Sequence, residues 1–118
     1  MIKLVFCLKR RPEMSREEFQ KYWYEQHAPL VRSFAEVLGI RRYVQVHTME
    51  TPANAAIRGS RNAPPEYDGV AELWFDSLGG TGHPDAAAAG AALLEDERKF
   101  IDLENSPLWF AEEKPIVG

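Results

Sequence analysis

The residue best suited to chemistry in this sequence is His27, two positions before Pro29 in a segment with helical periodicity. Trp23, Leu30 and Phe34 recur on the same face of that helix, so the imidazole is predicted to share their apolar surface. A histidine titrates near neutral pH and can take or give a proton there. Two interpretations stay open. His27 is an acid–base group facing a pocket, or it donates to a carbonyl freed by Pro29 and locks a helical kink.

Glu97 is a second candidate, because it falls between Leu93 and Phe100 on the apolar face of a predicted helix. A carboxylate on such a face is costly unless it is paired or protonated. Glu97 is therefore an acid with a raised pKa, one half of an ion pair at a dimer seam, or a residue at the edge of the stripe whose carboxylate reaches water. Its neighbour Asp96 is predicted to belong to a solvated face.

Two further carboxylates, Asp68 and Glu72, lie four residues apart on a predicted strand and share a face with Val70 and Trp74. In the functional interpretation they are pocket acids beside an aromatic platform. Asp-Gly is also the commonest tight-turn pair, so Asp68 is assigned to a turn with Gly69. For Glu72 the functional and structural interpretations both stay open.

Aromatic residues accompany these candidates and predict either a binding surface or an ordinary core. A pocket that suits a flat, apolar ligand would be lined by Phe6, Tyr22, Trp23, Trp74 and Phe75. The alternative is that these rings only fill the core of the domain.

The sequence lacks the residue patterns that several other kinds of site require. The three histidines have no metal-ligand spacing, so no metal is predicted, and no cofactor either. Residues 79–82, Gly-Gly-Thr-Gly, lack the Lys-Ser/Thr of a phosphate-binding loop and are assigned to a turn. A net charge of -4 gives no basic excess for nucleic acid. A single cysteine, no signal-peptide pattern and no membrane-length apolar run predict a cytoplasmic protein without membrane attachment.

The elements that position these residues are predicted to form one domain over residues 1–118. Ser15 and Glu18 form a capping box at the start of the first helix, and Pro29 predicts a kink or break near His27. Apolar patterning predicts strands and helices in the order strand 2–8, helix 16–38, strand 40–48, strand 70–75, helix 84–101 and strand 108–112.

This order is that of an α+β, ferredoxin-like βαββαβ fold. Residues 49–66 show no period and are predicted to be an irregular insertion loop. The first strand is apolar on both faces, with Val5 and Cys7 on the face opposite Phe6. Because two helices cover only one face of a sheet, a second copy of the chain is predicted to cover the other, which makes a homodimer.

Four segments together resemble the EthD-like family: MSREEF at 14–19, YWYEQHAPL at 22–30, YDGVAELWF at 67–75 and DERKFID at 96–102. The resemblance spans most of the chain except 49–66, and the segment ending in His27-Ala28-Pro29 is its most specific part. It implies a dimeric α+β barrel with a pocket between sheet and helices, and it matches the family's histidine to His27. It implies no single reaction, because a fold does not fix a function.

Two functions follow as hypotheses. The first is an enzyme acting on an apolar or aromatic small molecule by cyclisation, dehydration or isomerisation, with His27 as acid–base group and Glu72 or Glu97 orienting it. The second is a non-catalytic binding or accessory protein for a neighbouring oxidase, with a small monooxygenase as a further alternative.

Overall fold

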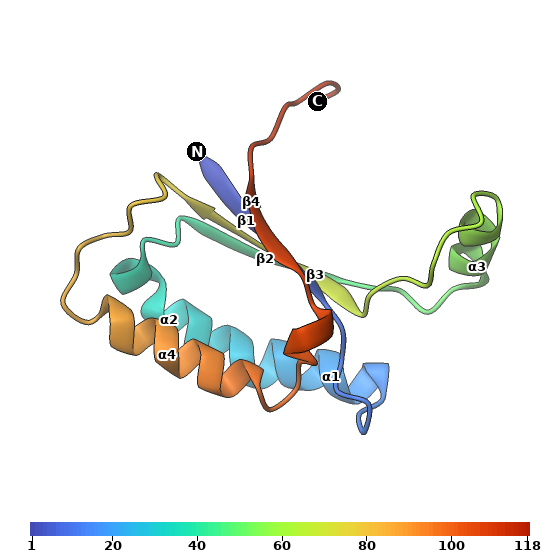
Figure 1. Ribbon diagram of the computed structural model, residues 1–118, viewed down its shortest axis with the longest axis horizontal. Coiled ribbons are helices and arrows are strands. Elements are labelled where there is room, and N and C mark those ends of the chain that lie inside the picture. Colours follow the sequence, from blue (N-terminus) through green and yellow to red (C-terminus); the bar gives the residue numbers. More distant parts are fainter.

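The computed structural model describes all 118 residues as a four-stranded sheet with helices on one side (Figure 1). The strands are β1 (Ile2–Leu8), β2 (Arg42–His47), β3 (Gly69–Phe75) and β4 (Leu108–Ala111). The helices are α1 (Arg16–Tyr22), α2 (Ala28–Leu38), α3 (Pro52–Gly59) and α4 (Ala86–Glu97), with a π-helical turn η1 (Trp23–His27) and a 3₁₀ turn η2 (Leu103–Asn105). Apart from α3, the predicted order of strands and helices is confirmed.

The sheet has the strand order β2-β3-β1-β4, and every neighbouring pair is antiparallel. α1 and α2 follow each other end to end beneath the sheet, α4 lies beside α2, and together they form the second layer (Figure 1). The α+β, ferredoxin-like fold predicted from the sequence is therefore present. No helix of the structure has the length and apolarity needed to cross a membrane.

The pleat of the strands gives the sheet two distinct faces. Tyr43, Leu73 and Leu4 are cross-strand partners in one row, and all three point toward the helices on what we call the helix-covered face. The next residue along each strand points the other way, onto the open face, where no helix of this chain lies (Figure 1). Its cross-strand rows are Arg42, Trp74, Lys3, Ala111; Val44, Glu72, Val5, Trp109; and Val46, Val70, Cys7.

The first helical segment carries both features predicted for it. Ser15 accepts from the Glu18 N–H while the Glu18 carboxylate accepts from the Ser15 N–H, so the capping box is confirmed. The interruption caused by Pro29 takes the form of η1, in which Ala28 N–H donates to the carbonyl of Trp23, five residues back. Proline has no N–H to continue the helical ladder, and one wider turn absorbs that loss without separating α1 from α2.

The segment 49–66 is not the irregular loop that the sequence predicted, because it contains α3. Thr51 caps this helix by accepting from the Ala53 N–H, and Pro52 occupies its first position. No residue of α3 is buried, and the helix projects away from the sheet and the other helices (Figure 1). The sequence analysis missed it because the helix has only eight residues, and Pro52, Asn54 and Gly59 among them are residues typical of loops.

The helical layer packs on the sheet through an aromatic core. Phe19, Trp23 and Phe100 are almost fully buried, and the Phe19 ring lies between the other two, at centroid distances of 5.6 Å from Trp23 and 5.5 Å from Phe100. Gly69 at the start of β3 lies under the Trp23 indole, where a Cβ would come within 2.4 Å of a ring carbon. The absence of a side chain at 69 thus lets Trp23 lie flat against the sheet.

Candidate active site between the sheet and the helices

A cavity of about 210 Å³ lies between the helix-covered face and the helices. Fourteen of its sixteen lining residues are hydrophobic, and the two others are His27 and Glu97. Phe6 from β1 and Trp23 from η1 also line it, as the sequence analysis proposed for a ligand pocket. An apolar chamber with two titratable groups of different chemistry is the usual form of a small-molecule site.

The imidazole of His27 is held in one orientation by Asp96. Its Nδ1 lies 2.7 Å from a carboxylate oxygen of Asp96, and the histidine is 5% exposed. The structural interpretation named a carbonyl freed by Pro29 as the partner of His27. The partner is instead the carboxylate of Asp96. Nε2 has no hydrogen-bond partner in the chain. Every fully buried side-chain nitrogen or oxygen does have a partner, so Nε2 is not fully buried. Nε2 is therefore accessible to a molecule in the cavity.

The protonation of this pair follows from its surroundings. Burial opposes ionisation of Asp96, but hydrogen bonds from Tyr22 and His27 outweigh it and lower the pKa of Asp96. An ionised carboxylate only accepts, so Nδ1 of His27 carries the proton and Nε2 keeps its lone pair. Burial lowers the pKa of His27 against the opposing effect of Asp96, which keeps the imidazole neutral at pH 7. His27 thus presents a base to the cavity.

Asp96 is the functional residue that the sequence analysis missed, since it was assigned to a solvated face. It is 8% exposed and also accepts from the Tyr22 hydroxyl at 2.6 Å, while Lys99 lies 3.6 Å away. Its spacing to Phe100 places it one turn before a fully buried ring, on the inner side of α4. The spacing of four residues before an aromatic core residue was the signal in the sequence that Asp96 lies on the buried side of its helix.

Glu97 presents a carboxyl to the same cavity without any hydrogen-bond partner in the chain. Burial first, and then the charge of Asp96, raise the pKa of Glu97 to about 7, against a smaller opposing effect of Arg98. Near neutral pH a large fraction of Glu97 is therefore protonated and can donate a proton.

Tyr22 does not line the cavity, although the sequence analysis placed it in a ligand pocket. Its ring packs 5.0 Å from Phe100, and its hydroxyl donates to Asp96. Burial first, and then this contact with Asp96, raise the pKa of Tyr22 to about 12, so the hydroxyl keeps its proton. Tyr22 therefore supports Asp96 and touches no ligand in the cavity.

The structure does not bring Glu72 or Trp74 to the cavity either. Both lie on the open face, because they alternate along β3 with Ala71 and Leu73, which do line it. Glu72 pairs with Lys3 at 2.5 Å, and the Trp74 indole N–H donates to Glu113. The sheet thus separates Glu72 from His27, so it cannot orient that imidazole within the chain.

Asp68 is an anchor between elements rather than part of a tight turn. Its buried carboxylate accepts from the backbone N–H of Arg10 at 2.8 Å and from the guanidinium groups of Arg10 and Arg16 at 2.9 and 2.8 Å. Burial opposes its ionisation, yet these bonds lower the pKa of Asp68. The turn assignment is therefore wrong, and Asp68 joins the ends of β1, α1 and β3. No group of three or more His, Cys, Asp or Glu side chains is placed to hold a metal ion.

Comparisons with known proteins agree with this architecture. A family model described as the EthD domain matches residues 11–104, which include η1, α4 and both groups of the cavity. No match is found among curated proteins.

Solved structures with the same fold include an EthD family protein from Bacillus halodurans, with 22% identity, coverage of 97% of this chain and 99% of that chain, and a TM-score of 0.66. An EthD-like protein from Ralstonia eutropha matches at 19% identity over 94% of this chain and 90% of its own, with a TM-score of 0.55. A dimeric protein of unknown function with a ferredoxin-like fold, from Bacteroides fragilis, matches at 14% identity over 95% of each chain, with a TM-score of 0.58. At these identities the likeness shows the fold alone.

Proposed function

The chain belongs to the EthD domain family, and from its cavity we propose that it binds a small apolar or aromatic molecule and moves protons on it with His27 and Glu97. The observation that carries this proposal is the composition of the lining, in which His27 and Glu97 are the two residues that are not of a hydrophobic type. Two titratable groups whose surroundings shift their pKa values in opposite directions are typical of an acid–base pair.

The division of roles follows from the partners of each group. His27 takes a proton at Nε2, and the Asp96 carboxylate at Nδ1 stabilises the imidazolium that forms. Glu97 gives a proton to an atom of the substrate that gains negative charge. Removing one proton and returning another is the chemistry of isomerisation, dehydration and cyclisation. Glu72, on the other side of the sheet, has no part in this scheme.

The size of the cavity limits the substrate. A cavity of about 150 Å³ holds a benzene molecule, so 210 Å³ suits one aromatic ring with a short substituent. We therefore choose phenylacetone as probe, because its benzylic protons lie next to a carbonyl and exchange measurably in deuterated water.

The test compares the rate of that exchange, followed by proton NMR, in the wild type and in His27→Gln. We expect the wild type to accelerate exchange and His27→Gln to lose about 100-fold of the acceleration. His83→Gln, which alters an exposed histidine before α4, is the matched control and should change nothing. A wild type that binds phenylacetone without exchanging its protons would instead identify a non-catalytic binding protein.

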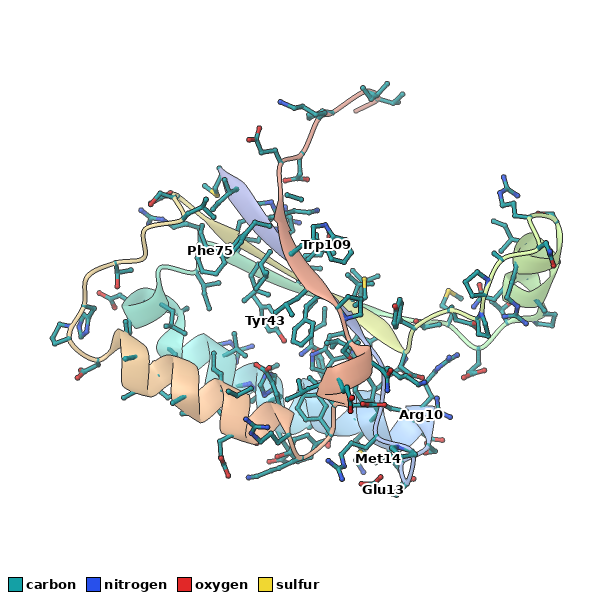
Figure 2. All side chains as sticks on the ribbon, in the orientation of Figure 1. Arg10, Glu13, Met14, Tyr43, Phe75 and Trp109 are labelled. Atoms are coloured by element: carbon teal, nitrogen blue, oxygen red, sulfur yellow. The ribbon has the colours of Figure 1, made fainter.

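We also propose that a second copy of the chain covers the open face. This face exposes Trp109 and Val46 at 49% and 45%, beside the apolar side chains of Val5, Val44 and Val70. Figure 2 shows Trp109 on the side of the sheet away from the helices. Exposed apolar side chains gathered on one face, here around the Lys3–Glu72 pair, mark an interface, and one structural relative is described as dimeric.

The oligomeric state tests this second proposal. Light scattering should give twice the chain mass of 13.4 kDa for the wild type, and the mass of one chain for Trp109→Lys at the same concentration. A wild type that stays at the mass of one chain at micromolar concentration would contradict the dimer.

A further inference from the structure

The hydroxyl of Tyr43 is held by a side chain behind it. Gln45, on the same strand β2, places its Nε2 3.0 Å from the backbone carbonyl of Trp23 and 2.8 Å from the Tyr43 hydroxyl oxygen. A backbone carbonyl only accepts, so the amide nitrogen, and not the amide oxygen, must face Trp23. The second N–H of that nitrogen therefore donates to Tyr43, whose oxygen is the acceptor.

The rest of the Gln45 amide is also occupied, which fixes its orientation. Its Oε1 lies 2.8 Å from Nε2 of His47, and the His47 ring stacks on Trp23 at a centroid distance of 4.5 Å. The carbonyl of Trp23 belongs to η1, the turn that also carries His27. One local distortion of the helix thus orders groups on both sides of the cavity.

The proton of the Tyr43 hydroxyl has no acceptor in the chain. Tyr43 lines the cavity, and Figure 2 shows it reaching from β2 into the space between the sheet and the helices. Burial raises the pKa of Tyr43. Hydrogen bonds with Gln45 and Trp23 act in the opposite direction and the charge of Glu97 adds a smaller increase, so the pKa stays raised and the hydroxyl stays protonated. The cavity therefore contains an O–H donor that can bind an acceptor on a ligand.

We propose that Tyr43 is the residue that recognises the ligand, and that this ligand is an uncharged compound with an apolar body and a carbonyl oxygen that accepts the Tyr43 hydrogen bond. The inference rests on the function proposed above, because it concerns the same cavity. A carboxylate ligand is excluded by the lining, which holds no cationic side chain and carries Glu97 instead. A carbonyl also suits the chemistry, since it makes the neighbouring C–H acidic enough for a histidine base.

The proton-transfer step balances within these groups. His27 Nε2 takes the proton from the carbon next to the carbonyl, and the C–H electron pair becomes the C=C bond of an enol. The carbonyl π pair moves to oxygen, which takes the proton of Glu97 while Tyr43 donates a hydrogen bond to it. The step leaves imidazolium and carboxylate, and return of a proton from His27 to the same carbon, with the enol proton going back to Glu97, restores both and completes one exchange. Where the substrate carries a C=C bond conjugated to the enol, return of the proton to the far carbon of that bond completes an isomerisation instead.

The experiment measures Kd for phenylacetone and for propylbenzene, which lacks the oxygen, in the wild type and in Tyr43→Phe. The ring of Phe keeps the packing, so only the hydroxyl is removed. We expect Tyr43→Phe to weaken phenylacetone binding by about 3- to 10-fold and to leave propylbenzene binding unchanged or tighter. Tyr24→Phe, at an exposed position outside the cavity, is the matched control and should alter neither value.

A spectroscopic measurement separates a direct hydrogen bond from an indirect effect. The carbonyl stretch of bound phenylacetone should lie at lower frequency in the wild type than in Tyr43→Phe. If the variant changes both affinities equally, or leaves the stretch where it was, Tyr43 is not the donor, whereas wild-type binding and proton exchange still support the proposed function. If neither probe binds the wild type, the proposed function and this inference fail together.

Discussion

The two faces of the sheet differ in whether their charged or ionisable side chains have partners. On the open face every charged side chain of the central rows has a partner, since Lys3 pairs with Glu72 and the Arg42 guanidinium lies 4.7 Å from the Trp74 ring centroid. Over the helix-covered face, Glu97 faces an apolar cavity with no partner. An unpaired carboxyl costs stability, so its presence on one face only is best explained by a role in binding or chemistry.

A similar contrast exists within α4, between neighbours. Asp96 accepts hydrogen bonds from Tyr22 and His27, which lower its pKa, whereas Glu97 has no donor, and burial raises its pKa to about 7. Both carboxyls are shielded from water, so burial alone does not decide their protonation. The number of donors decides it, and this gives the chain a fixed anion beside a proton donor.

The largest expected effect comes from removing the fixed anion. Asp96→Ala leaves the Tyr22 hydroxyl and Nδ1 of His27 without their partner, and we expect a loss of about 3 kcal/mol in the free energy of unfolding. Proton exchange should fall as well, because His27 loses the acceptor that sets its tautomer. Denaturant unfolding measures the first effect. Glu95→Ala, an exposed carboxylate one residue earlier, should stay within about 0.5 kcal/mol of the wild type.

A second test fills the space under Trp23. In Gly69→Ala the new Cβ would lie 2.4 Å from the indole and 2.9 Å from the carbonyl of Val46, so the buried ring must move. We expect a loss of about 2 kcal/mol from overpacking, together with weaker probe binding, because Trp23 lines the cavity. Gly90→Ala in α4 has free space around it and should gain stability instead. Equal effects of the two substitutions would contradict this account of Gly69.

The protonation of Glu97 gives a pH test of the same face. A carboxyl with a folded-state pKa of about 7 keeps its proton at pH values where the same group in the unfolded chain, with its ordinary pKa of 4.5, has lost it. Its contribution to stability therefore falls as pH rises from about 4.5 to 7. His27 acts in the opposite direction. Its pKa is lower in the folded chain than the 6.5 of the unfolded chain, so its contribution to stability rises with pH until pH exceeds 6.5.

The difference between wild type and Glu97→Gln isolates the effect of Glu97. The variant should be more stable than the wild type at pH 8 and lose that advantage by pH 4.5, with a change of roughly 2 kcal/mol after allowance for solvent screening. Unfolding curves at several pH values measure it. Tyr43, Asp96, Arg98 and His27 are the charged or titratable groups around Glu97 and are unchanged in the variant. A constant difference across this range would show that the pKa of Glu97 is the same in the folded and the unfolded chain.

The fold was predictable from local patterns because alternation, the Ser15 capping box and Pro29 each act within a few residues. His27 and Glu97 could be found too, as polar residues on apolar helical faces. The spacing of Asp96 to Phe100 indicated its burial, but the hydrogen bonds of Asp96 and Gln45 could not be predicted, because they depend on which helix faces which strand. Glu72 shows the same limit: the alternation placed it on the face of Val70, but only the helix positions reveal that this face lies away from the cavity.

The smallest expected effect lies on the open face, and it completes the comparison. Glu72→Gln removes one partner of Lys3, whose ammonium still lies 3.8 Å from Glu113. Because Gln keeps an oxygen that accepts from the Lys3 ammonium and Lys3 keeps a second carboxylate, we expect a loss of about 1 kcal/mol or less. The sheet separates the site from the cavity, so proton exchange and probe affinity should equal those of the wild type. A loss of exchange in Glu72→Gln comparable to that in His27→Gln would mean that the two faces are coupled, which would contradict their separate roles.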